Sequence, residues 1–165
     1  MYKEPHRWTM PYVFYALLTT VQNHTRLTEK RTKVMERSIF TAENCFVKNM
    51  HHKKTIDESM YKILKEWFRF NEKTISIQAD LIIYLRTSQE IVHERMLKRG
   101  RSEESTVSLQ YLQELHELHE DWLIRRPSKT IPILVLNGDL DLANIGAEYK
   151  RAEYHILNAT LKAEE

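Results

Sequence analysis

Two short apolar runs, separated by a long stretch with helical spacing, constrain the fold of this chain most strongly. Residues 79–85 and 131–136 are rich in β-branched side chains and have the length of strands. Between them, residues 109–124 repeat apolar side chains every three or four positions, as an amphipathic helix does. Strands that alternate with helices favour a parallel α/β sheet, because a parallel connection needs a dozen or more residues.

The rest of the chain extends this alternation. Residues 33–38 have the pattern of one more short strand. Nothing in the sequence looks like a repeat, a low-complexity tract or a Pro/Gly-rich linker, so we expect a single domain over residues 1–165. Further helices are predicted at residues 10–24, from a cap at Ser38 or Thr41 to about Met50, at 57–71, after Ser88, and at 144–161.

Composition excludes several classes of protein. The 25 Lys and Arg against 23 Asp and Glu leave a net charge of +2, which gives no case for a nucleic-acid or membrane partner. The single cysteine, Cys45, cannot form an internal disulfide, which favours a reducing, intracellular compartment. No apolar run approaches the ~20 residues of a membrane span. The first residues also lack the apolar core of a signal peptide.

A cluster of arginines follows the run at residues 79–85. Arg95 and Arg99 share one helix face, and Gly100 then lets the chain turn so that Arg101 points to nearly the same place. Converging guanidinium groups suit a polyphosphate, because each binds phosphate oxygens in bidentate fashion. The alternative is a solvated basic helix end, with Glu103 and Glu104 as ion partners.

The placement of polar residues at strand ends favours the phosphate interpretation. A parallel α/β sheet binds its ligand beyond the carboxyl ends of its strands. The residues that fall at or just after those ends are Glu36 and Arg37, the arginine cluster, and Asn137, Gly138 and Asp139.

Several separated motifs resemble the deoxyribonucleoside kinases, in order and from Met1 to at least Asn144. The resemblance implies a P-loop-kinase-like parallel sheet with flanking helices. It also implies transfer of the γ-phosphate of ATP, with Mg²⁺ as part of the co-substrate, to the 5′-hydroxyl of a deoxyribonucleoside in nucleotide salvage. The motifs are residues 1–5, Met35-Glu36-Arg37-Ser38, Tyr84-Leu85-Arg86-Thr87, residues 98–104 and residues 111–123.

The resemblance also implies a role for individual residues. Arg95, Arg99 and Arg101 would form a lid over the transferring phosphates. Arg37 would lie beside the 5′-hydroxyl, with Glu36 helping to fix the site. The 3′-hydroxyl would be held by Tyr2 and Glu104, the base by walls containing Tyr12, Val13, Ala16, Ala42, Phe46 and Met50, and the adenine of ATP by the loop at Asn137, Gly138 and Asp139. The family dimerises through helices, here residues 10–24 and 57–71.

Structural alternatives accompany these assignments. Tyr12, Ala16 and Phe46 would be ordinary core residues in most helices of this kind, and Glu36 and Arg37 could form a simple ion pair. His116 and His119 lack the spacing and the third ligand of a metal site, so we predict no metal. Cys45 is expected to be a small core filler.

The chain departs from the family pattern in one decisive way. Its only glycines are at 100, 138 and 146, so it contains no glycine-rich phosphate loop. In the family that loop, the strand before it and the general base precede the region matched by Met1. We therefore expect a chain truncated at its N-terminus, without the first, central strand, that is inactive and poorly stable because the strands at 33–38 and 79–85 would expose unpaired edges.

Two further departures affect the base pocket. Val13 stands where the family has a glutamine that binds the base edge, and Glu43 replaces an arginine beside the pocket. Base recognition is therefore expected to be weakened or altered. The alternative function is a non-catalytic interaction protein that pairs with a kinase paralogue through its helices. A small nucleic-acid-binding module is a weaker possibility, because no basic stripe is interleaved with aromatic residues.

Overall fold

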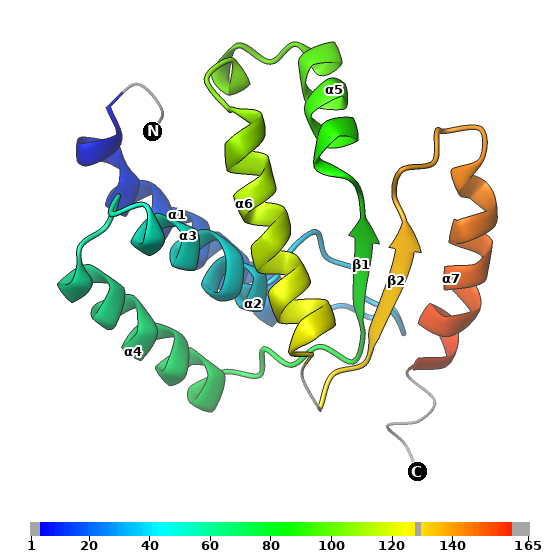
Figure 1. Ribbon diagram of the computed structural model, residues 1–165. Coiled ribbons are helices and arrows are strands. Elements are labelled where there is room, and N and C mark those ends of the chain that lie inside the picture. Colours follow the sequence, from blue (N-terminus) through cyan, green and yellow to red (C-terminus); the bar gives the residue numbers. More distant parts are fainter. Residues whose placement is uncertain (1–3, 128–129, 160–165) are drawn as a thin grey trace. The chain divides into compact units, whose positions relative to one another are not determined.

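The computed structural model describes residues 4–127 and 130–159, which divide into two compact units. We call Met1–Gln78 the helical unit and Ala79–Glu165 the sheet unit, and each is described by itself. The sheet unit contains parallel strands connected by helices, so the α/β class expected from the sequence is confirmed (Figure 1). The expectation of a single domain stays a prediction.

The helical unit begins with the long helix α1, Pro5–Thr25. Pro5 occupies the first turn, where its missing N–H has no intrahelical partner to lose, so the helix can begin there, before the predicted start at residue 10. Neither α1 nor any other helix among the described residues is long and apolar enough to cross a bilayer. One nearly continuous helical segment follows, composed of α2 (Ile39–Thr41), a π-helical turn (Ala42–Val47) and α3 (Lys48–His52).

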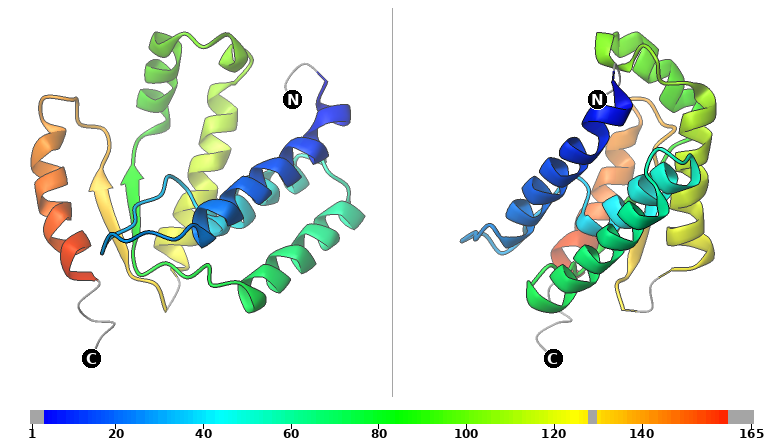
Figure 2. Two further views of the ribbon diagram at one scale, coloured as in Figure 1. Left: turned by 180° about the vertical axis from the view of Figure 1, so that it is seen from behind. Right: turned by 90° about the vertical axis from the view of Figure 1, so that its left-hand side faces the viewer.

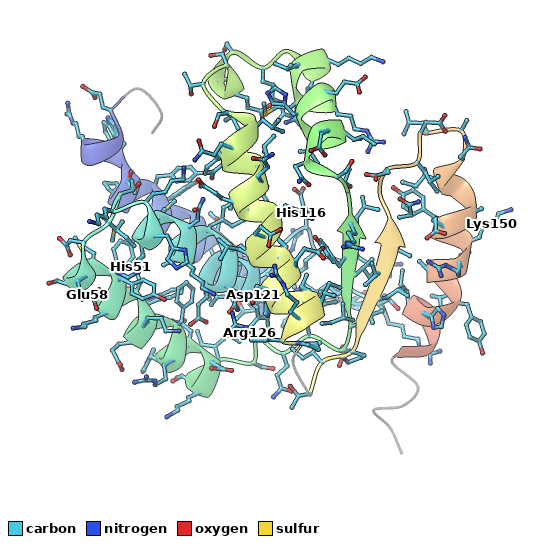
Figure 3. All side chains as sticks on the ribbon, in the orientation of Figure 1. His51, Glu58, His116, Asp121, Arg126 and Lys150 are labelled. Atoms are coloured by element: carbon cyan, nitrogen blue, oxygen red, sulfur yellow. The ribbon has the colours of Figure 1, made fainter. Side chains whose placement is uncertain are left out.

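Helix α4, Glu58–Thr74, completes the unit. The Asp57 side chain caps it by accepting a hydrogen bond from the Met60 N–H at 2.8 Å. His51 joins α3 to α4, because its Nε2 lies 2.9 Å from a Glu58 carboxylate oxygen (Figure 3). The His51 ring also stacks on Tyr61, with 4.0 Å between the ring centroids. The helix predicted at residues 57–71 is therefore present and runs three residues further.

The core of the helical unit lies where α1 and α4 pack against the segment 39–52 (Figure 2). Cys45 is completely buried, and burial raises the pKa of its thiol to about 12. The thiol is therefore protonated at neutral pH and acts as a core filler, as expected. The buried apolar side chains of the core cluster are Val13, Leu17, Ile39, Val47, Ile56, Leu64, Phe68 and Ile77.

The strand predicted at residues 33–38 is wrong. The segment is irregular, with bends at Glu36 and Arg37, and Val34 is 74% exposed. A strand forms only where a neighbouring strand pairs with its backbone, and the sheet among the described residues contains β1 and β2 alone. The β-branched and apolar pattern of Val34 and Met35 is therefore not sufficient to form a strand here.

The sheet unit is built on β1 (Ile82–Arg86) and β2 (Ile133–Asn137), which run parallel with Ile82 opposite Ile133. The connection between them contains α5 (Gln89–Arg99), a 3₁₀ turn at Ser102–Glu104, and α6 (Leu109–Glu120) with a π-helical end at Asp121–Arg125. Arg126 folds back on Asp121 there, as an ion pair (Figure 3). Helix α7, Ile145–Ala159, follows β2 and packs against it (Figure 1).

The two edges of this sheet differ. On the outer edge of β2, Arg151 of α7 donates to the Val135 carbonyl at 3.3 Å, and Glu148 accepts from the Asn137 N–H at 3.3 Å. These side chains satisfy backbone groups that a further strand would otherwise pair. Among the described residues no strand pairs with the other edge of β1.

The sequence predicts a buried strand at residues 79–85, but β1 is only partly buried. Ile83 is 37% exposed and Leu85 is 44% exposed. Both side chains lie on the same face of the strand, and α7 packs against β2 rather than β1. The prediction of a strand is thus confirmed, while its burial is overestimated.

Candidate functional site

The turn Glu36–Arg37–Ser38 is the most distinctive part of the helical unit. Arg37 has φ of 62°, a left-handed conformation that is uncommon for a residue other than glycine. Its guanidinium carbon lies 4.8 Å from the centroid of the Phe46 ring, at cation–π distance. Glu36 and Arg37 are both exposed, and the described residues contain no ion pair between them, so the alternative of a simple ion pair is wrong. Strained, exposed residues of this kind cluster at functional sites.

Two sets of contacts hold the turn in place. The Ser38 hydroxyl accepts a hydrogen bond from the Thr41 N–H at 3.3 Å and so caps α2. On the other side, Nε2 of His24 accepts from the Ile39 N–H at 3.2 Å. Burial, with a further contribution from Lys33, lowers the pKa of His24 and keeps the ring neutral. Sequence reasoning missed His24, because no local pattern links it to a backbone group fifteen residues later.

The residues predicted to wall the base lie on α1 and on the segment 39–52, and they differ in exposure. Val13 is a core residue at 4% exposure, whereas Tyr12 beside it is 52% exposed and so is not the core residue of the structural alternative. Phe46 is half-buried beneath Arg37. Ala16, Ala42 and Met50 are also partly buried. Tyr2 lies outside the described residues. The role of these residues in base binding stays a prediction.

In the sheet unit, Arg95 reaches the loop after β2. Its Nη1 donates to the carbonyl of Gly138 at 2.7 Å. Its Nη2 donates to the carbonyls of Asp139 at 3.1 Å and Leu140 at 2.8 Å. The structure therefore brings one predicted lid arginine together with the predicted adenine loop.

Arg99 and Arg101 share a different partner. Nη2 of Arg99 donates to both carboxylate oxygens of Glu104, at 2.8 and 2.7 Å. Arg101 lies 3.7 Å from the same carboxylate. Gly100, with φ of 67°, makes the turn between them that brings Arg101 toward the same carboxylate as Arg99, as the sequence suggested. The three guanidinium groups are thus divided between two partners, and Glu104 acts as the ion partner foreseen in the alternative interpretation.

The loop 137–140 also packs closely on the turn between β1 and α5. The Gly138 N–H donates to the Arg86 carbonyl at 2.8 Å, and the Ser88 N–H donates to the Asp139 carboxylate at 2.6 Å. A Cβ atom at Gly138 would lie 2.1 Å from the Thr87 hydroxyl and 3.0 Å from the Arg86 carbonyl. Glycine is therefore required at this position by close packing.

A cleft of about 440 Å³ opens beside this loop, at the carboxyl ends of β1 and β2. Parallel α/β sheets bind ligands in this position. Both predicted adenine-loop side chains, Asn137 and Asp139, contribute to its wall. The remaining lining residues are Arg86, Ser88, Gln89, His116, Val135, Leu136, Glu148 and Arg151.

One wall of the cleft is stabilised by a buried carboxylate that sequence reasoning missed. Arg86 donates to both oxygens of Glu120, at 2.9 and 2.8 Å, and the Tyr84 hydroxyl donates to the same group at 3.0 Å. Burial raises the pKa of Glu120, but the hydrogen bonds from Arg86 and Tyr84 outweigh it, so the pKa lies below its usual value. The one available signal was Arg86, which the sequence places at a strand end among apolar residues.

The histidines of α6 have structural partners. His116, labelled in Figure 3, has its Nε2 3.9 Å from a Glu120 carboxylate oxygen, and Nδ1 of His119 lies 2.7 Å from the Leu115 carbonyl. The His119 ring also stacks on Tyr84. Across the part of the chain that the structure describes, no group of three His, Cys, Asp or Glu side chains is arranged to hold a metal ion.

Comparison with known proteins decides the family. A model of the deoxynucleoside kinase family matches residues 1–160. The chain belongs to the deoxynucleoside kinase family. The match includes both units and every residue singled out above, so the resemblance seen in the separate motifs is confirmed over nearly the whole chain.

Named relatives of this kinase family agree. The chain is 38% identical over 141 residues to human mitochondrial thymidine kinase 2, which is 84% of this chain and 53% of the relative. It is 31% identical over 157 residues to human deoxycytidine kinase, 86% of this chain and 60% of the relative. With mitochondrial deoxyguanosine kinase of Xenopus laevis it shares 30% over 163 residues, 89% and 62% of the two chains. The chain thus spans between half and two thirds of the length of these kinases.

Proposed function

We propose that this chain carries the acceptor-nucleoside, lid and adenine-loop portions of a kinase that transfers the γ-phosphate of ATP to the 5′-hydroxyl of a deoxyribonucleoside. The observation that carries the proposal is the Glu36–Arg37–Ser38 turn. A family motif falls at a strained, exposed arginine held over an aromatic ring. Mg²⁺ would enter with ATP as part of the donor substrate, and we assign no protein ligand to it.

The geometry suggests how the parts would act. Arg37 presents a guanidinium group next to the position proposed for the 5′-hydroxyl, where negative charge develops as the phosphoryl group arrives. Arg99 and Arg101 are turned by Gly100 toward one place and balance the carboxylate of Glu104. A phosphate would compete with Glu104 for the same guanidinium groups, and this exchange would free Glu104 for the 3′-hydroxyl.

We further propose that these 165 residues alone do not catalyse the transfer. A donor-phosphate loop needs several glycines whose amides approach the phosphates, and residues 1–99 contain none. The test is ATP-dependent phosphorylation of thymidine and deoxycytidine by the purified chain. We expect no turnover above a no-protein background. Turnover that Arg37→Ala abolishes would disprove the proposed inactivity and support the proposed site.

A second function has its own support. Helix α1 exposes large apolar side chains, with Tyr15 at 67% and Leu18 at 53% exposure, and α4 exposes Ile63 at 55% and Phe70 at 62%. Apolar side chains gathered on helices favour association with another helical surface. We propose that α1 and α4 pair with a second copy of this chain or with a related kinase. Light scattering after size exclusion should give twice the monomer mass, and Leu18→Glu should restore the monomer.

The names of two relatives state that they are mitochondrial. We therefore propose an intracellular site of action, in the mitochondrion or the cytoplasm, which tagging of the complete gene product would distinguish.

A further inference from the structure

The guanidinium group of Arg95 has little capacity left for a phosphate. Nη2 donates to two carbonyls, those of Asp139 and Leu140, and Nη1 donates to the carbonyl of Gly138. Each of the two edges by which a guanidinium binds an oxyanion in bidentate fashion includes Nη2. Bidentate phosphate binding by Arg95 would therefore require the release of at least one loop carbonyl.

The loop needs this support. Its other hydrogen bonds run from the Gly138 N–H to the Arg86 carbonyl, from the Ser88 N–H to the Asp139 carboxylate, and from the Asp139 N–H to the Asn137 side chain. The three carbonyls of residues 138–140 point to Arg95 instead. A single arginine from α5 thereby satisfies three consecutive backbone acceptors and gives the loop a fixed curvature.

We propose that Arg95 is a positioning residue for the loop 138–140, which it holds in shape by binding three successive carbonyls, while Arg99 and Arg101 are left to bind phosphate. This inference rests on the proposed function in one respect, namely that the loop contacts the adenine of ATP. Arg95 would thus act on the adenine end of the nucleotide, and Arg99 and Arg101 would act on its phosphates, although the sequence places all three in one cluster.

The first experiment needs no ligand. Backbone ¹⁵N relaxation and amide exchange are compared for the wild-type chain, Arg95→Lys and Arg99→Lys. Arg95→Lys keeps the charge, but a single ammonium cannot span three carbonyls. We expect faster motion and faster exchange at residues 138–142 in Arg95→Lys, and wild-type behaviour there in Arg99→Lys. Unchanged dynamics at residues 138–142 in a folded Arg95→Lys would overturn the proposal.

A wild-type measurement guards against a variant that fails to fold. The guanidinium ¹⁵N–¹H signals of Arg95 should be resolved and in slow exchange, with hydrogen-bond couplings to the carbonyl carbons of residues 138–140. Rapidly exchanging, averaged signals from Arg95 would contradict the proposed binding of the three carbonyls, even if no variant could be studied.

The second experiment separates the two arginine roles. The titrants are ATP, adenosine and inorganic tripolyphosphate. Arg95→Lys should weaken binding of ATP and adenosine by about tenfold and leave tripolyphosphate within about twofold. Arg99→Lys should show the reverse preference. Equal loss of ATP and tripolyphosphate in Arg95→Lys would make Arg95 a phosphate ligand and overturn the inference. If the wild-type chain bound no nucleotide, the proposed function would fail. The ligand-free measurements would still test whether Arg95 holds the loop 138–140.

Discussion

At the scale of single residues, the neutral side chain of His24 helps to hold the turn that carries Arg37. Its Nε2 accepts a hydrogen bond from the Ile39 backbone, two residues beyond Arg37. Only the unprotonated nitrogen can accept, so protonation of His24 would release the start of α2 and the strained turn before it. The Lys33 ammonium strengthens this arrangement by binding the His24 and Arg26 carbonyls at 2.9 and 2.7 Å.

The pKa of His24 is lower in the folded chain than its usual 6.5, so the unfolded chain binds the proton more readily. Stability from this group is fully present above pH 6.5 and is lost as the pH falls through the folded pKa. Urea melts at pH 7.5 and 5.5 should therefore show a drop in unfolding free energy for the wild type. His24→Gln, which keeps an acceptor but does not titrate, should show a smaller drop. The exposed His52→Gln serves as control, and a wild-type drop no larger than that of His24→Gln would contradict this role.

A buried carboxylate gives a second prediction at this scale. Glu120→Gln should lower the unfolding free energy by about 1–2 kcal/mol, because it removes the charge bound by Arg86 and Tyr84. The pKa of Glu120 lies below 4.5 in the fold, so its contribution is present above pH 4.5 and is lost as the pH falls through the lower folded value. Thermal melts at pH 7 and pH 3 measure both effects. The control is Glu117, an exposed carboxylate that pairs with Arg125. Glu117→Gln should change stability by less than about 0.5 kcal/mol, and equal effects of the two variants would refute the stabilising role of Glu120.

At the scale of secondary-structure elements, the loop after β2 depends on close backbone packing. Gly138→Ala should destabilise the chain by about 1–3 kcal/mol, because its Cβ would overlap Thr87 and press on the Arg86 carbonyl. Gly146→Ala, in the first turn of α7 with nothing within 4 Å of the added atom, should stabilise by about 0.5–1 kcal/mol. Chemical denaturation of both variants tests the prediction. Similar effects at the two glycines would show that the loop is looser than described.

The same scale shows what the sequence could predict and why. Periodicity located α4 and α6 well, because an amphipathic helix repeats its apolar face regardless of what it packs against. The strand at residues 33–38 was wrong, because a strand depends on a partner that local pattern does not contain. The sequence places Gly138 directly after a strand, but its close approach to Thr87 and the Arg86 carbonyl depends on the fold. The partners of Arg95 and His24 lie 43 and 15 residues away, beyond any local signal.

At the scale of the whole molecule, the open edge of β1 limits stability. The backbone groups of Ile83 and Leu85 face away from β2, and no described strand pairs with them. We expect the isolated 165-residue chain to have an unfolding free energy at or below about 5 kcal/mol, the lower end for native domains. Urea melts at several chain concentrations would measure it. A monomer that unfolds cooperatively, with an unfolding free energy well above that value at low temperature as well, would contradict the expectation.

The central claim is that the turn at Arg37 belongs to a nucleoside site. Calorimetric titration with each of the four common deoxyribonucleosides tests it most directly, on chain shown by circular dichroism to be folded. The wild type should bind at least one of them saturably, Arg37→Ala should bind it at least about tenfold more weakly, and the exposed Arg31→Ala should bind it as the wild type does. A folded wild type that binds none of them, or an Arg37→Ala variant with unchanged affinity, would contradict the claim.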